Sequence, residues 1–255
     1  AAISACEKCG ELQPALALLQ EMWSRMLVPN VISYNAAISA CEKGKQAELA
    51  LGLLQEMQER GLEPDLISYN AAISACEKGE QGHHALSLLQ QMRQRGVTPN
   101  VVSYNAAISA CGKGREANVA LELLRDIEGV GLVPDVISYN AAMSACGHCG
   151  QPKLILELLR ELRASDLRPD LISYNAAISA CEKSQRLDLA SDLLLELRSN
   201  GLTPNVITYN AFISACEKCG QFERALEVMT EMRDSGVTPD VVSYNAAISA
   251  CEKGG

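Results

Sequence analysis

The 255-residue sequence has no long apolar run, no excess of positive charge and only three histidines. Although 48% of the residues are hydrophobic, they occur in short runs, whereas a membrane-spanning helix needs roughly 18 or more consecutive apolar residues. We therefore expect no membrane partner. The net charge of −9 argues against indiscriminate binding to nucleic acid, because basic side chains that neutralise phosphates supply non-specific affinity. The placement of the charges thus matters more than their sum.

The scarcity of histidine also argues against an enzyme. His83 and His84 are adjacent in a segment that is expected to be helical, and His148 occupies a place that lysine holds elsewhere in the pattern described below. No serine or cysteine gains a distinctive acid or base partner, so a catalytic site is not predicted. We accordingly expect no cofactor and no small-molecule substrate.

Cysteine, in contrast, is abundant, with eleven residues. Eight of them recur every 35 residues: Cys6, Cys41, Cys76, Cys111, Cys146, Cys181, Cys216 and Cys251. Equivalent positions in stacked helices would lie roughly 8–10 Å apart, which exceeds the limit of about 7 Å between the Cα atoms of a disulfide. The three C-x-x-C pairs are Cys6/Cys9, Cys146/Cys149 and Cys216/Cys219. They lie too far apart to supply four ligands to one zinc ion. We expect reduced packing residues and no metal site, with zinc binding or redox use as the less favoured alternative.

A strict internal repeat organises the whole chain. The dipeptide Tyr-Asn occurs seven times at a constant spacing of 35 residues, with no insertion or deletion. Counted from Val31 as repeat position 1, the complete repeats are 31–65, 66–100, 101–135, 136–170, 171–205 and 206–240. Partial repeats cover 1–30 and 241–255. We predict one repeat array over 1–255, and we expect a fragment of a longer chain because both ends fall within a repeat.

Each repeat has two apolar stripes with helical spacing. In repeat 31–65 the first stripe, which follows the i, i+3, i+4, i+7 rule, is Tyr34, Ala37, Ile38 and Cys41. The second stripe is Ala50, Leu51, Leu54 and Met57. Each repeat is therefore predicted to be a helical hairpin, and the whole chain to be all-α.

Glycine and proline mark the predicted ends of these helices. The first helix is expected to end at Gly44, Gly79 and Gly114, or one position later at Gly150 and Gly220. Gly61 followed by Pro64 ends the second helix, and repeat position 34 is proline in all seven occurrences. A constant turn favours regular stacking, so we predict an α-solenoid. Ala36 and Ala40 would allow neighbouring first helices to approach closely.

One face of the first helix carries a recurring polar pattern. Repeat positions 2, 5, 9, 12 and 13 fall within an arc of about 100°, roughly opposite the buried stripe. In repeat 31–65 these residues are Ile32, Asn35, Ser39, Glu42 and Lys43. Asparagine costs roughly half a kcal/mol or more relative to alanine within a helix. Its recurrence at position 5 therefore needs a reason other than helix stability.

A purely structural role is one explanation for this asparagine. It would serve as an N-cap, but position 3 already offers a capping hydroxyl two residues upstream, at Ser33, Ser68, Ser103, Ser138, Ser173, Thr208 and Ser243. Position 35 is always asparagine or aspartate, and both residue types suit a turn after proline. A turn would accept serine or glycine equally, so we favour a ligand-binding role.

The 35-residue hairpin, which in most repeats begins V-[IV]-[ST]-Y-N and ends G-[LV]-x-P-[DN], resembles the pentatricopeptide repeat family over the whole chain. The resemblance implies an α-solenoid, coiled as a right-handed superhelix, that binds single-stranded RNA with one base per repeat. It also implies that the RNA runs 5′ to 3′ along the N- to C-terminal direction. The implied location is the mitochondrion or the chloroplast, and the implied role is RNA processing, stabilisation, splicing or translation.

The resemblance assigns roles to three sets of residues. Position 5 is expected to contact the base and position 35 to tune the choice, in the pairs Asn35 with Asp65, Asn70 with Asn100, Asn105 with Asp135, Asn140 with Asp170, Asn175 with Asn205 and Asn210 with Asp240. Asn30 and Asn245 are the corresponding residues of the partial repeats. Position 2 is expected to hold the base between Ile32, Ile67, Val102, Ile137, Ile172, Ile207 and Val242. Position 13 is expected near a phosphate, at Lys8, Lys43, Lys78, Lys113, Lys183, Lys218 and Lys253, with His148 as the exception.

In the family's code, asparagine with aspartate favours uracil and asparagine with asparagine favours cytosine, which gives the predicted pyrimidine-rich footprint 5′-UCUUCU-3′. Aspartate only accepts hydrogen bonds, so it would take the amide NH₂ and leave the asparagine carbonyl for uracil N3–H. Asparagine at position 35 would donate instead, so that the turned amide offers an N–H to cytosine N3. Glutamate at position 12 in six of eight repeats is expected to weaken binding.

The main alternative is a scaffold similar to the tetratricopeptide repeat family, which binds proteins with similar hairpins. That family has a period of 34 residues, and a peptide-binding groove would vary from repeat to repeat. Here positions 5 and 35 are nearly constant. Additional protein partners are also compatible with the sequence.

Overall fold

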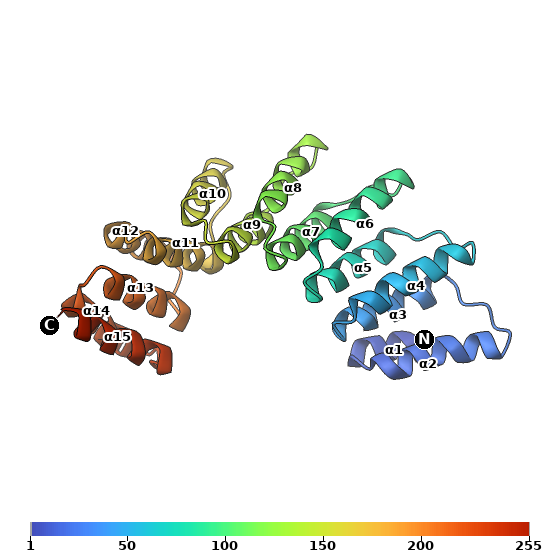
Figure 1. Cartoon of the computed structure of the whole chain (residues 1–255), viewed down its shortest axis with the longest axis horizontal. Coiled ribbons are helices and arrows are strands. Elements are labelled where there is room, and N and C mark those ends of the chain that lie inside the picture. The colour runs from blue at the N-terminus through green and yellow to red at the C-terminus, as the bar shows by residue number, and fades with distance from the viewer. Residues whose placement is uncertain (1, 255) are drawn as a thin grey trace. The chain divides into compact units, whose positions relative to one another are not determined.

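The computed structural model describes residues 2–254, which form fifteen helices and no strand (Figure 1). The helices are α1 (Ala2–Cys9), α2 (Leu12–Ser24), α3 (Val31–Lys43), α4 (Ala47–Glu59), α5 (Leu66–Lys78), α6 (Gly82–Gln94), α7 (Val101–Lys113), α8 (Ala117–Gly129), α9 (Val136–His148), α10 (Pro152–Ala164), α11 (Leu171–Lys183), α12 (Leu187–Ser199), α13 (Val206–Lys218), α14 (Phe222–Asp234) and α15 (Val241–Gly254). None of these described helices has both the length and the apolar character needed to span a membrane. The predicted all-α fold is confirmed.

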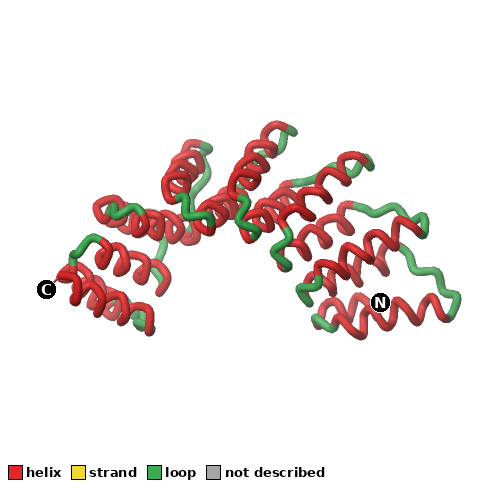
Figure 2. The backbone as a smooth tube through the Cα atoms, viewed as in Figure 1, coloured by secondary structure: helices red, strands yellow, loops and turns green. Residues whose placement is uncertain are grey.

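Every complete repeat is a helical hairpin, as predicted. The odd-numbered first helix occupies repeat positions 1–13 and the even-numbered second helix occupies positions 17–29. Figure 2 shows the loops that join the two helices and that lead to the next repeat. The stripes that were predicted to be buried contain fully buried residues such as Tyr34, Ile38 and Met57, whereas Leu51 is only half-buried. Removal of this apolar surface from water is the main stabilising contribution to each hairpin.

The first helices begin with an N-cap at repeat position 35. The Asp65 side chain accepts a hydrogen bond from the backbone N–H of Ser68 at 2.9 Å, and the Ser68 hydroxyl accepts one from the Asp65 backbone N–H at 3.1 Å. This reciprocal arrangement is a capping box. The position-3 hydroxyl thus takes part in capping, as predicted, but as the third helical residue of the box, whereas the N-cap itself is at position 35. Asparagine and aspartate recur at position 35 because both are among the best N-caps.

The first helices α3 to α13 end at repeat position 13, directly before the position-14 glycine that was predicted to end α3, α5 and α7, and the left-handed residue follows at position 15. Gly44 is the C-cap of α3 with a φ of −77°, and the left-handed residue is Lys45 at φ 54°. Of the glycines predicted to end these helices, Gly150 and Gly220, which lie at position 15, take this left-handed conformation. Glycine at position 14 instead serves packing in some repeats. A Cβ atom on Gly79 would lie 2.8 Å from Cβ of Ala47 in the preceding repeat.

The chain forms two compact units, Ala1–Pro134 and Asp135–Gly255. Within the first unit α1 packs on α3, α3 on α5 and α5 on α7. Within the second unit α9 packs on α11, α11 on α13 and α13 on α15. Ala36 and Ala40 are buried between first helices, so the expected close approach is confirmed. The boundary between the units coincides with the start of repeat 136–170 to within one residue, and a single array over 1–255 stays a prediction.

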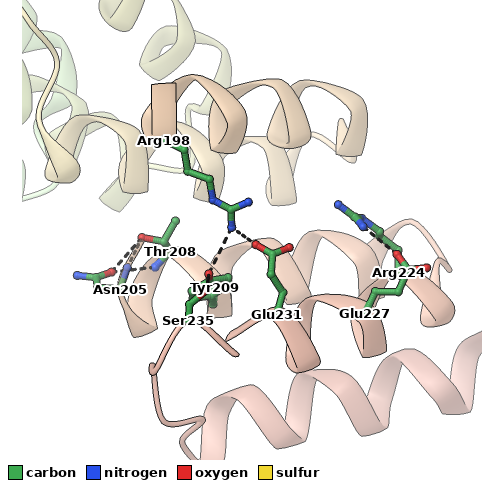
Figure 3. Close-up of polar contacts among 8 residues, drawn as sticks. All are labelled: Arg198, Asn205, Thr208, Tyr209, Arg224, Glu227, Glu231 and Ser235. Atoms are coloured by element: carbon green, nitrogen blue, oxygen red, sulfur yellow. Dashed lines mark hydrogen bonds and ion pairs between the residues drawn. The ribbon is translucent and has the colours of Figure 1, made fainter. Parts of the chain in front are cut away.

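Polar contacts also join consecutive second helices within a unit. Figure 3 shows Arg198 of α12 in contact with the Tyr209 hydroxyl and the Glu231 carboxylate of the next repeat. Arg163 of α10 forms the equivalent ion pair with Glu196 at 2.6 Å. These pairs are more than one third exposed, so each contributes about 1 kcal/mol or less. They favour one register between neighbouring hairpins, while the apolar core supplies most of the stability.

Candidate nucleic-acid interface

Aliphatic side chains at repeat position 2 project into solvent along the first helices. Their exposed fractions lie between 56% and 69% at Ile32, Ile67, Val102, Ile137, Ile172, Ile207 and Val242. Large apolar residues repeated on an exposed face at constant spacing indicate contact with a ligand more strongly than isolated ones do. The structure therefore leaves these seven side chains accessible to a base, as the predicted role requires.

The asparagine at position 5 lies beside the position-35 residue of the same repeat. Its Nδ2 atom donates to Oδ1 of aspartate at 3.0 Å in the pairs Asn35 with Asp65, Asn140 with Asp170 and Asn210 with Asp240. The equivalent distance to asparagine Oδ1 is 3.5 Å from Asn70 to Asn100 and 3.3 Å from Asn175 to Asn205. Hydrogen bonds to ionised acceptors are shorter and stronger than neutral ones. Five of the six predicted pairs are thus brought together by the fold.

The sixth pair, Asn105 with Asp135, and the residues of the partial repeats are described separately from these five pairs. Asn105 belongs to the first unit and Asp135 to the second, so their pairing stays a prediction. Asp135 caps α9 by accepting from the backbone N–H of Ser138 at 2.8 Å. Asn30 caps α3 in the same way, with a distance of 3.1 Å to the Ser33 backbone nitrogen. Asn245 in α15 is exposed.

The position-3 hydroxyl of the next repeat completes each pair. Ser68 Oγ donates to Oδ1 of Asn35 at 2.5 Å and lies 2.9 Å from Oδ1 of Asp65. The same hydroxyl contact to asparagine Oδ1 measures 2.5 Å from Ser103, 2.7 Å from Ser173, 2.6 Å from Thr208 and 2.5 Å from Ser243. Figure 3 includes the contact between Thr208 and its cap, Asn205. Three side chains from two consecutive repeats thus lie together: positions 5 and 35 of one repeat and position 3 of the next. We call each such set a recognition group.

This geometry corrects the expected behaviour of asparagine at position 35. Asn100 and Asn205 use Oδ1 to accept the N-cap hydrogen bond, at 3.0 Å in both cases. The same oxygen faces the position-5 amide, so these residues accept and do not donate. The position-5 amide consequently has the same orientation in both kinds of pair. The pairs differ in the charge of the acceptor and in the length of the contact.

The carboxylates of Asp65 and Asp240 are held in their ionised form. Burial raises the pKa of Asp65, but hydrogen bonds from the Ser68 backbone and the Asn35 amide outweigh this effect, so the pKa lies below its usual value. At Asp240 the Ser243 backbone N–H and the Asn210 amide lower the pKa. Hydrogen bonds donated to a carboxylate favour its charged state. Aspartate at position 35 therefore acts as an acceptor at neutral pH.

Several position-13 lysines contact the preceding repeat. Lys113 Nζ lies 2.9 Å from the Glu77 carboxylate, and Lys253 Nζ lies 2.6 Å from that of Glu217. Lys43 donates to the Glu7 backbone carbonyl at 2.7 Å, with its carboxylate at 3.9 Å. The position-12 glutamates thus lie beside the lysines, as the sequence indicated. Lys183 follows a repeat with glycine at position 12 and donates to the Gly147 carbonyl at 3.1 Å.

Models of repeat families match this chain along most of its length. The pentatricopeptide repeat domain model matches residues 1–44, 52–115 and 157–219, which is more than half of the chain. The PPR repeat family model matches 99–146 and 204–253, and the PPR repeat model matches 32–62 and 137–167. The chain belongs to the pentatricopeptide repeat family. The matches agree with the Tyr-Asn period and the paired positions 5 and 35.

Solved structures of other pentatricopeptide repeat proteins are similar to this one. The crystal structure of maize PPR10 has 26% sequence identity, covers 99% of this chain and 41% of its own, and gives a TM-score of 0.60. PPR10 in complex with an 18-nt RNA element has 23% identity, covers 97% and 41%, and gives 0.61. The PPR domain of Arabidopsis thaliana protein-only RNase P 1 in complex with tRNA has 17% identity, covers 70% and 94%, and gives 0.61. Comparison with curated protein sequences gave no match.

These likenesses establish the helical solenoid fold. The chain spans about two fifths of the length of the PPR10 chains that it matches. The predicted family and the α-solenoid architecture are both confirmed.

Six of the cysteines of this pentatricopeptide repeat chain are packing residues. All eleven are free thiols, and six of the periodic ones, from Cys41 to Cys216, are fully buried. Burial raises the pKa of Cys41 to about 11 and that of Cys76 to about 12. Among the described residues, no group of three histidine, cysteine or acidic side chains is arranged to hold a metal ion.

The position-3 hydroxyl is the site residue whose role the sequence did not reveal. It was interpreted as a cap because it precedes the asparagine by two residues. The asparagine that it contacts lies 33 residues earlier in the chain, as Asn35 does relative to Ser68. A signal was nevertheless present, because every repeat has serine or threonine there and never another small residue. A cap alone would also accept aspartate or asparagine.

Proposed function

We propose that this pentatricopeptide repeat chain binds single-stranded RNA in a sequence-specific manner, with one base for each repeat and the footprint 5′-UCUUCU-3′. The observation that carries the proposal is the ladder of half-buried asparagine amides, each paired with position 35 and flanked by exposed aliphatic residues. Proteins that read single-stranded RNA need unstacked bases, apolar or aromatic faces against them, and hydrogen-bonding groups at the base edge. The repeats supply the apolar faces and the hydrogen-bonding groups at a constant interval.

The aliphatic side chains provide the surfaces for the bases. Ile32 and Ile67 belong to consecutive first helices that pack on each other, α3 and α5. A base placed between them would remove apolar surface from water on both of its faces, at about 25 cal/mol for each Å². This contribution does not depend on base identity. The choice of base must therefore come from the amide between them.

Each asparagine amide has one donor and one acceptor position left for a base. In the group of Asn35, Asp65 takes one Nδ2 hydrogen and Ser68 takes one lone pair of Oδ1. An amide has two hydrogens and two lone pairs, so one N–H and one lone pair remain. Uracil can donate N3–H to the remaining lone pair. The charged Asp65 holds Nδ2 firmly, and this favours a base that needs the acceptor.

Asparagine at position 35 holds the amide less firmly. The Nδ2 to Oδ1 distances of 3.5 Å for Asn70 and 3.3 Å for Asn175 exceed the usual range of about 2.7–3.2 Å for N–H···O hydrogen bonds. The amide N–H is then more available for donation to cytosine N3. The difference between uracil and cytosine thus arises from how strongly the position-35 residue holds the amide.

The lysines at position 13 would contact the RNA backbone. Seven contacts would give a slope of log K against log salt of about −5, from about 0.7 for each contact with a single strand. The ion pairs of Lys113 and Lys253 must open for this, so affinity for six nucleotides is expected to be modest. Positive charge placed on one face explains how a chain with a net charge of −9 binds an anionic ligand.

The implied biological role follows the family resemblance. We propose action in a mitochondrion or chloroplast, in the processing, stabilisation, splicing or translation of a transcript, without catalysis by the repeats. The repeat residues specify only a pyrimidine pattern within the target transcript. Other protein partners are compatible with the exposed second helices.

Selection from a randomised single-stranded RNA pool at a stated salt concentration tests the proposal. Enrichment of UCUUCU-like sequences is expected, with the purine-substituted hexamer bound at least about tenfold more weakly, since each correctly read base contributes about 1–3 kcal/mol. Enrichment of no sequence, together with binding to peptides, would instead identify a scaffold of the tetratricopeptide type. RNA binding without base preference would disprove the code and leave only backbone binding.

A further inference from the structure

The hydroxyl at repeat position 3 is placed to control the asparagine of the preceding repeat. Ser68 is fully buried, and its oxygen lies within hydrogen-bond distance of both Asn35 and Asp65. The same arrangement recurs with Ser103, Ser173, Thr208 and Ser243. Capping explains the contact with position 35, but it does not explain a distance of 2.5 Å to a residue of another repeat.

The direction of this hydrogen bond is determined by the other contacts of the hydroxyl. The Ser68 oxygen accepts the backbone N–H of Asp65 at 3.1 Å, so its single proton points toward the acceptors Asn35 Oδ1 and Asp65 Oδ1. The shorter distance, 2.5 Å against 2.9 Å, assigns the proton to the asparagine carbonyl. The carbonyl is thereby held on the side of the serine, and the Nδ2 group on the side of position 35.

A rotated amide would be unfavourable to different degrees in the two kinds of pair. In the group of Asn35, rotation would place the amide oxygen against the Asp65 carboxylate, so charge repulsion opposes it as well as loss of the hydroxyl bond. In the group of Asn70, the facing atom is the neutral Oδ1 of Asn100. The hydroxyl of Ser103 is then the main group that holds the orientation of the amide.

We propose that the position-3 hydroxyl is a third specificity-determining element, which fixes the asparagine amide of the preceding repeat and is most important where position 35 is asparagine. This inference rests on the proposed RNA-binding function. The hydroxyl does not touch the base, so it is a positioning residue. The recognition group for the second base of the footprint is Asn70, Asn100 and Ser103, and that for the first base is Asn35, Asp65 and Ser68.

The test compares variants at Ser103 in α7. Ser103→Ala removes the hydroxyl, and Ser103→Thr keeps it, as Thr208 does in another repeat. Ser24→Ala is the control, because Ser24 lies at the end of the second helix α2 and donates to the Glu21 backbone carbonyl at 2.8 Å, away from the amides. Binding is measured by fluorescence anisotropy with 5′-UCUUCU-3′ and with oligonucleotides that carry U, A or G at the second base.

Ser103→Ala is expected to reduce the preference for cytosine over uracil at the second base by about 3- to 10-fold, the effect of one hydrogen bond, while preferences at the other bases are retained. Ser103→Thr and Ser24→Ala should keep the wild-type ratio. Ser68→Ala should change the first-base preference by a smaller factor, because Asp65 still orients the amide.

The ratio between two RNAs separates positioning from stability. Loss of the capping hydrogen bond alone would lower the melting temperature and weaken both RNAs equally, so an unchanged ratio in Ser103→Ala would overturn the inference. A wild-type chain that binds none of the oligonucleotides would disprove the proposed function itself. Melting of each variant, followed by circular dichroism, shows that the chains being compared are folded.

Discussion

Exchange of the position-35 residues between two neighbouring repeats should exchange the bases that they select. The double variant Asp170→Asn with Asn205→Asp conserves the composition and the net charge of the chain. Its predicted preference is 5′-UCUCUU-3′ in place of 5′-UCUUCU-3′. Both groups lie in the unit Asp135–Gly255, so the exchange does not involve the boundary between the units.

The magnitude follows from the two hydrogen bonds. Asn140 Nδ2 lies 3.0 Å from the charged Asp170, and Asn175 Nδ2 lies 3.3 Å from the neutral Asn205. Hydrogen bonds to charged groups contribute about 1 kcal/mol more than neutral ones. Since about 1.4 kcal/mol is a factor of ten, each base preference should change about fivefold, and the preference between the two hexamers should change by about the product.

Stability should be nearly unaffected by this exchange. Asp170 and Asn205 are both N-caps that accept from the backbone N–H of position 3, at 2.9 Å and 3.0 Å. Aspartate and asparagine are nearly equivalent at this position. The assay is competition between the two labelled hexamers at one salt concentration, with each single variant as a control. If the double variant still binds UCUUCU more tightly than UCUCUU, the strength of the hydrogen bond between the asparagine amide and position 35 is not the basis of the code.

Two further predictions concern the lysines and the cysteines. Glu77→Gln should release Lys113 and raise RNA affinity by up to about fivefold, because the partly exposed pair that it breaks is worth about 1 kcal/mol or less. The matched control is Glu63→Gln in an exposed loop, and an equal effect of both variants in a salt titration would show a general charge effect. Burial raises the pKa of Cys76 and Cys216 to about 12, so at pH 8 almost no thiolate forms and iodoacetamide should modify the exposed Cys9 first. Mass spectrometry over time checks this order, and modification of Cys76 as fast as Cys9 would contradict the described packing.

The fold could be predicted in large part because its determinants are local. The spacing of Tyr34, Ala37, Ile38 and Cys41 defines the face that the first helix buries, and all four are buried. The period of 35 residues then requires that each hairpin meets its neighbours in the same way. The end of the first helix at Gly44 was predicted, but the left-handed residue lies one position later, at Lys45, because that conformation tolerates residues other than glycine.

The candidate site could be predicted only in part. The exposed position-2 ladder and five of the position-5 pairs follow from helical periodicity and from the family resemblance. The cap was assigned to Ser33 although Asn30 forms it, because several polar residues near a helix start satisfy the same preference. Choosing between them requires the backbone conformation at that point.

The sequence by itself determined the repeat, the hairpin and the face on which the asparagines lie, because each depends on residues a few positions apart in one helix. The tertiary structure alone decided that Ser68 meets Asn35 and that Lys113 meets Glu77, since these partners are separated by 33 and 36 residues. Such contacts depend on the rotation and the shift between packed helices. A period fixes how often two helices meet, whereas side-chain packing fixes which atoms touch.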